Sequence, residues 1–242
     1  MIPIKDILPS RSTPVVMFLI IACNVAVWFV ELAQGNRLEG FISIWGFIPA
    51  RILLSEDDPE KWLTPITSMF MHGGWAHIIG NMWFLWIFGD NVEDAFGHFG
   101  FLLFYLLCGI GAAAMQFIIS IHSPVPMVGA SGAISGVLGA YACFYPRARV
   151  VALVPVLFFL ELIEIPAIIF ITLWFLMQLM SGCMSIGINT SGGIAFWAHI
   201  GGFLYGWLIA RSWKKFLSKR GMRIYSQDED RVFTFKRRSG WW

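Results

Sequence analysis

The chain has 242 residues, of which 57% are hydrophobic and only 13% are charged, and its formal net charge is +2. Soluble domains carry about 25% charged residues, so this composition excludes an ordinary soluble domain and predicts an integral membrane protein. The four cysteines are scattered singly, without a C-x-x-C pair. We interpret them as apolar packing residues and expect no metal site and no cofactor.

Six apolar segments approach the length of about 20 residues that a helix needs to cross the bilayer core. They comprise residues 15–32, 74–88, 100–121, 127–145, 165–180 and 194–210. After the second segment we expect a turn in which Asn91 and Asp94 are available to cap the third helix. Segment 150–166 contains two prolines and two glutamates, and we interpret it as an amphipathic interfacial loop. The sequence therefore predicts an all-α polytopic membrane protein, a bundle of six transmembrane helices.

The basic residues predict how this bundle is oriented in the bilayer. Ten of the 17 lysines and arginines lie between Arg211 and Arg238, after the last apolar segment. Because positive charge accumulates on the cytoplasmic side, we expect a cytoplasmic N-terminal segment at 1–14, a six-span domain at 15–211 and a basic cytoplasmic tail at 212–242. The tail is open to two interpretations, binding to anionic lipid headgroups or a solvated, disordered end.

Three of the predicted helices carry polar groups that are costly in a membrane and therefore mark function or a packing contact. The second, fourth and sixth spans all run from outside to inside in the predicted topology. We expect Ser131 about four residues into the fourth span and His199 about six into the sixth, which places both roughly 6 to 10 Å below the outer surface. His77 and Asn81 lie four residues apart and so share one face of the second helix. These four side chains are therefore expected at similar depth.

Glycines in the fourth and sixth spans favour close helix packing. Gly129 and Gly132 flank Ser131, and Gly202 and Gly206 follow His199. Small residues at four-residue spacing let helix backbones approach closely in lipid. We expect this approach to bring His199 within hydrogen-bond reach of Ser131. Gln178, in the fifth span, is open to bonding across helices or to lining a polar path, and helix packing is the favoured interpretation.

An alcohol close to an imidazole is the minimal pair for nucleophilic catalysis. The outer half of the predicted spans contains no acidic residue, so a Ser131–His199 dyad is preferred to a triad with aspartate. Asn81 and His77 are candidates to stabilise the oxyanion, together with the Ser131 N–H group. Competing intramembrane chemistries would need an H-E-x-x-H zinc motif or paired aspartates within spans, and the sequence offers neither.

Three stretches resemble the motifs of the rhomboid family of intramembrane serine proteases, which have a six-helix core. They are "HGGWAHIIGNMWFLWIFGDNVED", "GASG" at residues 129–132 and "AHIGGFLYG" at residues 198–206, and the resemblance extends over about residues 15–211. It implies that Ser131 is the nucleophile and His199 the base, with His77 and Asn81 assisting the oxyanion. It also implies single-span membrane proteins as substrates, no metal or nucleotide, and no nucleic-acid partner.

The resemblance implies further properties, and the sequence departs from some family members at two positions. It implies that segment 34–71 lies partly in the membrane, that the fifth span or the segment before the sixth gates substrate access, and that the protein resides in a bacterial cytoplasmic membrane. Some members carry a tyrosine one turn after the serine, where this chain has Ser135, and a Trp-Arg pair near the position of Trp62. The alternatives are a non-catalytic relative that binds or escorts membrane proteins, and a small transporter.

Overall fold

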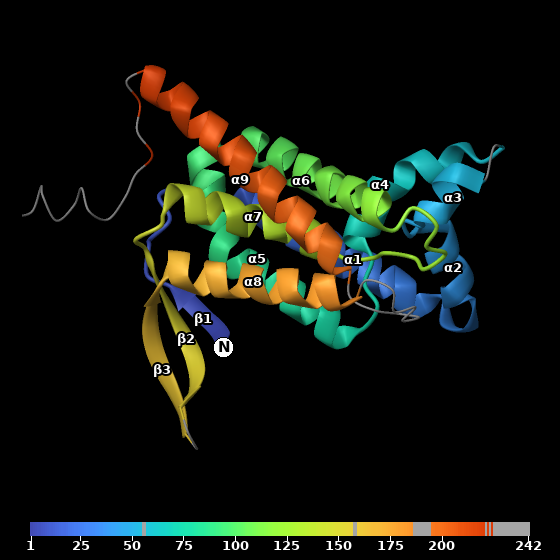
Figure 1. The fold of residues 1–242 in the computed structure, drawn as a ribbon, viewed down its shortest axis with the longest axis horizontal. Helices are drawn as coiled ribbons and strands as arrows, with labels where there is room; N and C mark the ends of the chain where they lie inside the picture. Colours follow the sequence, from blue (N-terminus) through green and yellow to red (C-terminus); the bar gives the residue numbers. More distant parts are fainter. Residues whose placement is uncertain (55–56, 157–158, 186–194, 221, 223, 225–242) are drawn as a thin grey trace, which may run out of the picture.

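The computed structural model describes residues 1–54, 57–156, 159–185, 195–220, 222 and 224. Its long helices lie side by side along the long axis (Figure 1). They are α1 (Val15–Ala33), α5 (Trp75–Phe96), α6 (His98–Ile119), α7 (Ser131–Phe144), α8 (Ala167–Ser185) and α9 (Phe196–Lys219). Each of the six predicted apolar segments therefore overlaps a helix.

Three helices in the described part of the chain are long and apolar enough to cross a membrane: Val15–Ala33, His98–Ile119 and Ala167–Met184. The protein is therefore an integral membrane protein, and it is mostly helical. α7 is a shorter apolar helix of 14 residues. Six membrane crossings remain a prediction, as do the proposed domain limits, and the predicted limit at residue 211 falls within α9.

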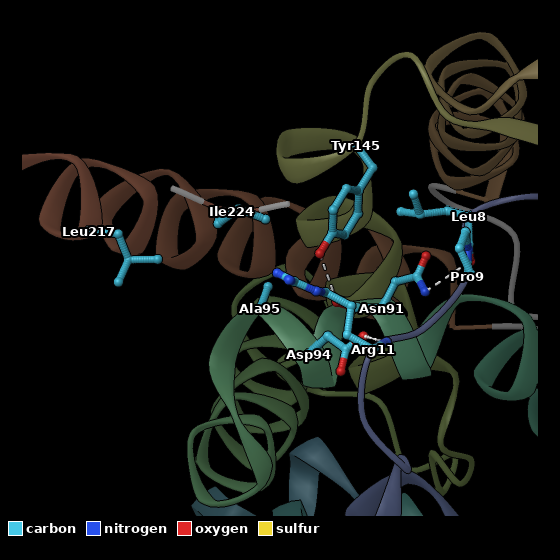
Figure 2. A pocket seen from close by; sticks show the side chains of 9 residues that line it. All are labelled: Leu8, Pro9, Arg11, Asn91, Asp94, Ala95, Tyr145, Leu217 and Ile224. Carbon is cyan, nitrogen blue, oxygen red and sulfur yellow. Dashed lines mark hydrogen bonds between the residues drawn. The ribbon is translucent and has the colours of Figure 1, made fainter. Parts of the chain in front are cut away.

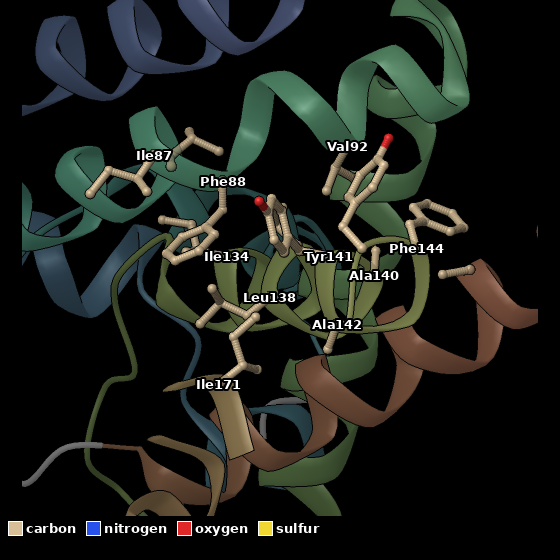
Figure 3. Packing of buried hydrophobic residues seen from close by; sticks show 14 of the residues in the cluster. Ile87, Phe88, Val92, Ile134, Leu138, Ala140, Tyr141, Ala142, Phe144 and Ile171 are labelled. Atoms are coloured by element: carbon tan, nitrogen blue, oxygen red, sulfur yellow. The ribbon is translucent and has the colours of Figure 1, made fainter. Parts of the chain in front are cut away.

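Helix α7 forms the centre of the bundle and packs against α5, α6, α8 and α9. Of its 14 residues, all except Ser131 and Cys143 are buried. Figure 3 shows the side of α7 that faces α5, where the Phe88 and Tyr141 rings meet edge to face with centroids 5.1 Å apart. Small residues cover the opposite side of α7, which allows α9 to approach closely.

The turn between α5 and α6 differs from the prediction. α5 continues to Phe96, and Gly97, with φ of 73°, separates it from α6. Asn91 and Asp94 therefore lie inside α5 and do not cap α6. Asp94 instead accepts hydrogen bonds from the N–H groups of Arg11 and Ser12, before α1. The physical reason is that a single glycine in the left-handed region of φ reverses the chain, so no longer polar turn is needed.

The carboxylate of Glu93 caps the first turn of α1. It accepts hydrogen bonds from the N–H groups of Val16 at 3.0 Å and Met17 at 2.7 Å, which have no partner within the helix. An anion at a helix N-terminus is also favoured by the helix dipole. Glu93 is itself buried and contacts His98 Nδ1 at 2.5 Å. Together these contacts of Glu93 fix the N-terminal end of α1 to the turn between α5 and α6.

A small antiparallel sheet shows that the all-α prediction was incomplete. Its strands β1 (Ile2–Asp6), β2 (Arg149–Val156) and β3 (Phe159–Pro166) are in the order β1-β2-β3. The predicted loop at 150–166 is wrong, because its described residues form the antiparallel hairpin strands β2 and β3, which Figure 1 shows projecting sideways from one end of the bundle. The segment is rich in β-branched and large apolar residues, which favour strands. Pro155 is tolerated because it lies beyond Leu153, the last β2 residue paired with β1.

Segment 34–71 contains a series of short helices. These are η1 (Gly35–Arg37), α2 (Leu38–Trp45), α3 (Pro49–Leu54), η2 (Pro59–Leu63), α4 (Thr64–Thr67) and η3 (Ser68–Phe70). Arg51 fixes them: its guanidinium donates to the carbonyls of Ser43 and Ile44 and to Asp58 at 2.6 Å. This hydrogen bond holds the pKa of Asp58 below its ordinary value. Trp62 is exposed, so the hydrogen bonds of Arg51, and not a buried Trp62 ring, join these short helices.

Candidate active site

Ser131 is the first residue of α7. The prediction placed it about four residues inside the helix, which is wrong because residues 127–130 are not helical. Gly129, with φ of 128°, directs the chain into the helix, a conformation that side-chain-bearing residues rarely adopt. The Gly129 N–H donates to the carbonyl of Ser68 at 2.9 Å, and Phe47 pairs with Met127. These hydrogen bonds to segment 34–71 therefore hold residues 127–129, which lead into Ser131, in place.

His199 lies in the first turn of α9 and meets Ser131 directly. Its Nε2 atom is 2.7 Å from Ser131 Oγ, within the normal range for a hydrogen bond. Both residues are half-buried. α9 begins at Phe196, so His199 is closer to the helix start than predicted. The serine and the imidazole, 68 residues apart in the chain, therefore occupy matching positions at the starts of neighbouring helices.

Close contact between α7 and α9 produces this alignment. A Cβ atom added at Gly202 would lie 1.9 Å from the carbonyl oxygen of Gly132, and one added at Gly206 would lie 2.2 Å from that of Gly136. No side chain fits at either position without moving the helices. Gly132 follows Ser131 directly, and Gly202 lies one turn beyond His199. The glycines therefore hold the two backbones at the distance that the Ser131–His199 contact requires.

The second ring nitrogen of His199 also has a partner. Nδ1 is 2.8 Å from Oε1 of Gln178, which lies on α8. Trp174, one turn earlier on α8, places its ring 6.1 Å from the imidazole, centroid to centroid. Ser135, at the position where some rhomboids have a tyrosine, donates from Oγ to the carbonyl of Ser131 at 2.6 Å. Both Gln178 and Trp174, which adjoin the His199 ring, therefore come from α8.

His77 reaches the site from the first turn of α5. A Cβ added at Gly129 would lie 2.6 Å from His77 Nε2 and 3.5 Å from Ser131 Oγ, so the two side chains flank Gly129. His77 Nδ1 accepts a hydrogen bond from the Gly73 N–H at 3.3 Å. A neutral imidazole carries one N–H and one acceptor nitrogen. The Nε2 atom beside Gly129 therefore carries the proton and is available as a donor.

Asn81 lies one turn after His77 on the same helix, as the four-residue spacing predicts. Its side chain is buried, and Nδ2 has no hydrogen-bond partner within the described residues. Buried polar groups are normally satisfied, so the unpaired amide of Asn81 is a candidate donor for the site. The structure links His77 to the Ser131 side of the site through Gly129, and it places Asn81 one turn deeper along α5.

A separate cavity of about 100 Å³ lies at the other end of α5. Figure 2 shows Asn91 and Asp94 from α5, Tyr145 after α7, and residues before α1 around it. The Tyr145 hydroxyl donates to the Asn91 carbonyl at 2.9 Å. Because His77 and Asp94 lie at opposite ends of a 22-residue helix, this cavity is not part of the Ser131 site. In the described residues no cluster of histidine, cysteine or acidic side chains could hold a metal ion.

The profile of the rhomboid domain matches residues 59–215, which include all four predicted site residues. The chain belongs to the rhomboid family. Over 114 residues this rhomboid is 41% identical to Rhomboid-like protein 11, chloroplastic, of Arabidopsis thaliana, which corresponds to 47% of the chain and 39% of the relative. It is 34% identical to Rhomboid protease GluP of Bacillus subtilis over 132 residues, 54% of the chain and 25% of the relative.

A third relative matches over a longer stretch. This rhomboid is 26% identical over 190 residues to Rhomboid protein 1, mitochondrial, of Saccharomyces cerevisiae, covering 73% of the chain and 50% of the relative. The chain therefore spans half or less of the length of these relatives. Chloroplastic and mitochondrial names among them do not support the expected location in a bacterial cytoplasmic membrane.

Proposed function

We propose that this rhomboid is an intramembrane serine endopeptidase that cleaves single-span membrane proteins in or near the membrane. The observation that carries the proposal is the 2.7 Å contact between Ser131 Oγ and His199 Nε2. A serine hydroxyl is a weak nucleophile until a neighbouring base accepts its proton. His199 Nε2 is in position to accept it.

The geometry supports an acyl-enzyme reaction. Ser131 Oγ bonds to the carbonyl carbon of the scissile peptide while its proton passes to His199 Nε2. As the C–N bond breaks, that proton is returned to the departing amine nitrogen. A water molecule, activated by the same imidazole, then hydrolyses the ester on Ser131 and restores the hydroxyl.

Charge that develops on the carbonyl oxygen needs donors at the site. The Nε2–H of His77 lies beside Gly129, the Nδ2 group of Asn81 is unpaired, and the first N–H groups of α7 have no partner within the helix. The dipole of α7 adds to this stabilisation because Ser131 is at its N-terminus. These groups are the proposed oxyanion site.

The length of α7 supports cleavage within the membrane. At 1.5 Å per residue its 14 residues extend about 21 Å, whereas the bilayer core is about 30 Å thick. If six helices cross the bilayer and α7 ends at the cytoplasmic boundary, Ser131 lies roughly 9 Å below the outer boundary. A short α7 thus leaves room above Ser131 for water and for a substrate segment.

Two variants test the proposal, Ser131→Ala and His199→Ala. Each purified protein is incubated in liposomes with a model single-span substrate and, separately, with a fluorophosphonate that labels activated serines. Both variants are expected to lose cleavage and labelling, while Ser135→Ala keeps the label because Ser135 is bonded to a main-chain carbonyl. Cleavage that persists in either variant, or a folded wild-type protein that neither cleaves nor labels, refutes the proposal. A folded wild-type protein that neither cleaves nor labels favours a binding or escort function.

A further inference from the structure

The orientation of His199 depends on the proton carried by its ring. A neutral imidazole has one N–H donor and one acceptor nitrogen, and only the acceptor can take a proton from Ser131. Ser131 faces Nε2 at 2.7 Å. A competent base therefore needs its proton on Nδ1, which requires an acceptor next to Nδ1.

Gln178 supplies that acceptor from α8. Its amide oxygen Oε1 is 2.8 Å from Nδ1 of His199. An amide oxygen is only an acceptor, so this contact places the proton on Nδ1 and leaves the Nε2 lone pair directed at Ser131. We propose that Gln178 is a positioning residue that completes a Ser131–His199–Gln178 triad. This inference rests on the proposed protease function.

Among the described residues, the other groups that contact or adjoin the imidazole do not provide this orientation. The hydroxyl of Ser135 is already engaged with the Ser131 carbonyl. The Trp174 ring packs near the imidazole at 6.1 Å and restricts its tilt, but it has no acceptor for Nδ1. Trp174 and Gln178 lie four residues apart, so one face of α8 contacts His199. A neutral amide plays a comparable role in the Cys-His-Asn proteases, which shows that this chemistry needs no carboxylate.

Gln178 lies on a different helix from the two members of the dyad. Ser131 and His199 lie on α7 and α9, which glycine contacts hold together, whereas α8 is at the edge of the bundle. On α8 the side chains of Leu173, Leu176, Met177 and Met180 are exposed. The Gln178 contact therefore exists only while α8 is packed against α9, and displacement of α8 would release the imidazole without separating the dyad.

Two substitutions separate positioning from packing. Gln178→Met preserves the length of the side chain and removes the acceptor, whereas Gln178→Glu keeps an acceptor and adds negative charge. We expect Gln178→Met to lower kcat and the rate of fluorophosphonate labelling about 10- to 100-fold, because a hydrogen bond to the imidazolium formed in the reaction is lost. KM is expected to change little, since the proposed role of Gln178 acts through the imidazole.

Gln178→Glu is expected to retain activity at alkaline pH and to move the acidic limb of the labelling rate to higher pH. The added carboxylate stabilises the protonated imidazole, which cannot act as a base. A side chain that only fills space would produce the opposite pattern, with methionine tolerated and a buried charge disruptive. The Gln178→Met variant covers a reversed amide, in which Gln178 would donate to Nδ1, because removal of that donor would not lower the labelling rate.

The control is Met177→Leu, which changes a neighbouring, exposed side chain of α8 and should behave as the wild type. The inference is overturned if folded Gln178→Met labels at the wild-type rate or faster, or if the acidic limb of Gln178→Glu does not move. If Gln178→Met does not fold, the pH profile of Gln178→Glu decides. These outcomes leave the protease proposal intact as long as the wild type cleaves and Ser131→Ala does not.

Discussion

Replacing Gly202 with alanine tests whether backbone contact between α7 and α9 holds the dyad together. The new Cβ would lie 1.9 Å from the carbonyl oxygen of Gly132, whereas Cβ atoms in proteins essentially never approach another heavy atom within 3.0 Å. The obstacle is main chain, so no side-chain rotation relieves it. α9 must move away from α7 by about 1 Å or more.

That movement is enough to break the central contact. Gly132 follows Ser131 and Gly202 lies one turn after His199, so the dyad moves with the helices. The Oγ–Nε2 distance of 2.7 Å would extend to about 3.7 Å, beyond the range of a hydrogen bond. We expect cleavage and fluorophosphonate labelling to fall about 100-fold, and the free energy of unfolding to fall by about 1 to 3 kcal/mol.

Gly80→Ala is the matched control for this substitution. An added Cβ at Gly80, within α5, meets no heavy atom within 4 Å, and alanine is favoured over glycine in a helix by about 1 kcal/mol. Labelling rates and unfolding by sodium dodecyl sulfate in mixed micelles are compared for both variants. Equal stability and equal labelling in Gly202→Ala and Gly80→Ala would falsify the idea that glycine contacts position the dyad.

Two further predictions concern other parts of the molecule. Burial raises the pKa of Asp6, whose carboxylate accepts from Tyr141 at 2.7 Å, to about 7. Since the folded pKa exceeds the ordinary value of 3.8, this group stabilises the protein at low pH, and that stability is lost as pH rises toward 7. The thermal unfolding temperature in detergent should therefore fall between pH 4 and 7, and Asp6→Asn should flatten that fall; an unchanged slope contradicts the assignment. At Gly129, with φ of 128°, an added Cβ would lie 2.6 Å from His77 Nε2, so Gly129→Ala should reduce labelling of Ser131 at least tenfold through strain and displacement of His77, and labelling at the wild-type rate would contradict the described site.

The arrangement of the catalytic candidates was accessible from the sequence because membrane helices have few degrees of freedom. Once the spans are placed, alternate helices run in the same direction, so polar residues near their starts fall at one depth. The glycine spacing then predicted which helices approach closely, and Ser131 and His199 are indeed in contact. That His77 and Asn81 share one face of α5 follows from helical periodicity alone.

The β-hairpin was missed for a physical reason. Segment 150–166 is a short apolar run interrupted by prolines, and periodicity alone does not distinguish a strand from other apolar structure in such a run. Its outer partner β1 comes from the first residues of the chain. A pairing between segments so far apart leaves no local signature, and only the folded bundle brings them together.

The sequence by itself determined the membrane environment, the helical segments, the family motifs and the serine–histidine pair, because hydrophobicity and helical spacing act locally. Only the tertiary structure decided that Ser131 is the first residue of α7, that Arg51 fixes segment 34–71, and that Gln178 contacts Nδ1 of His199. The start of α7 depends on the pairing of residues 127–129 with segment 34–71, and the other two depend on how one helix or segment is rotated about its axis relative to another. That rotation is set by side-chain packing across the whole bundle, which no local pattern in the chain encodes.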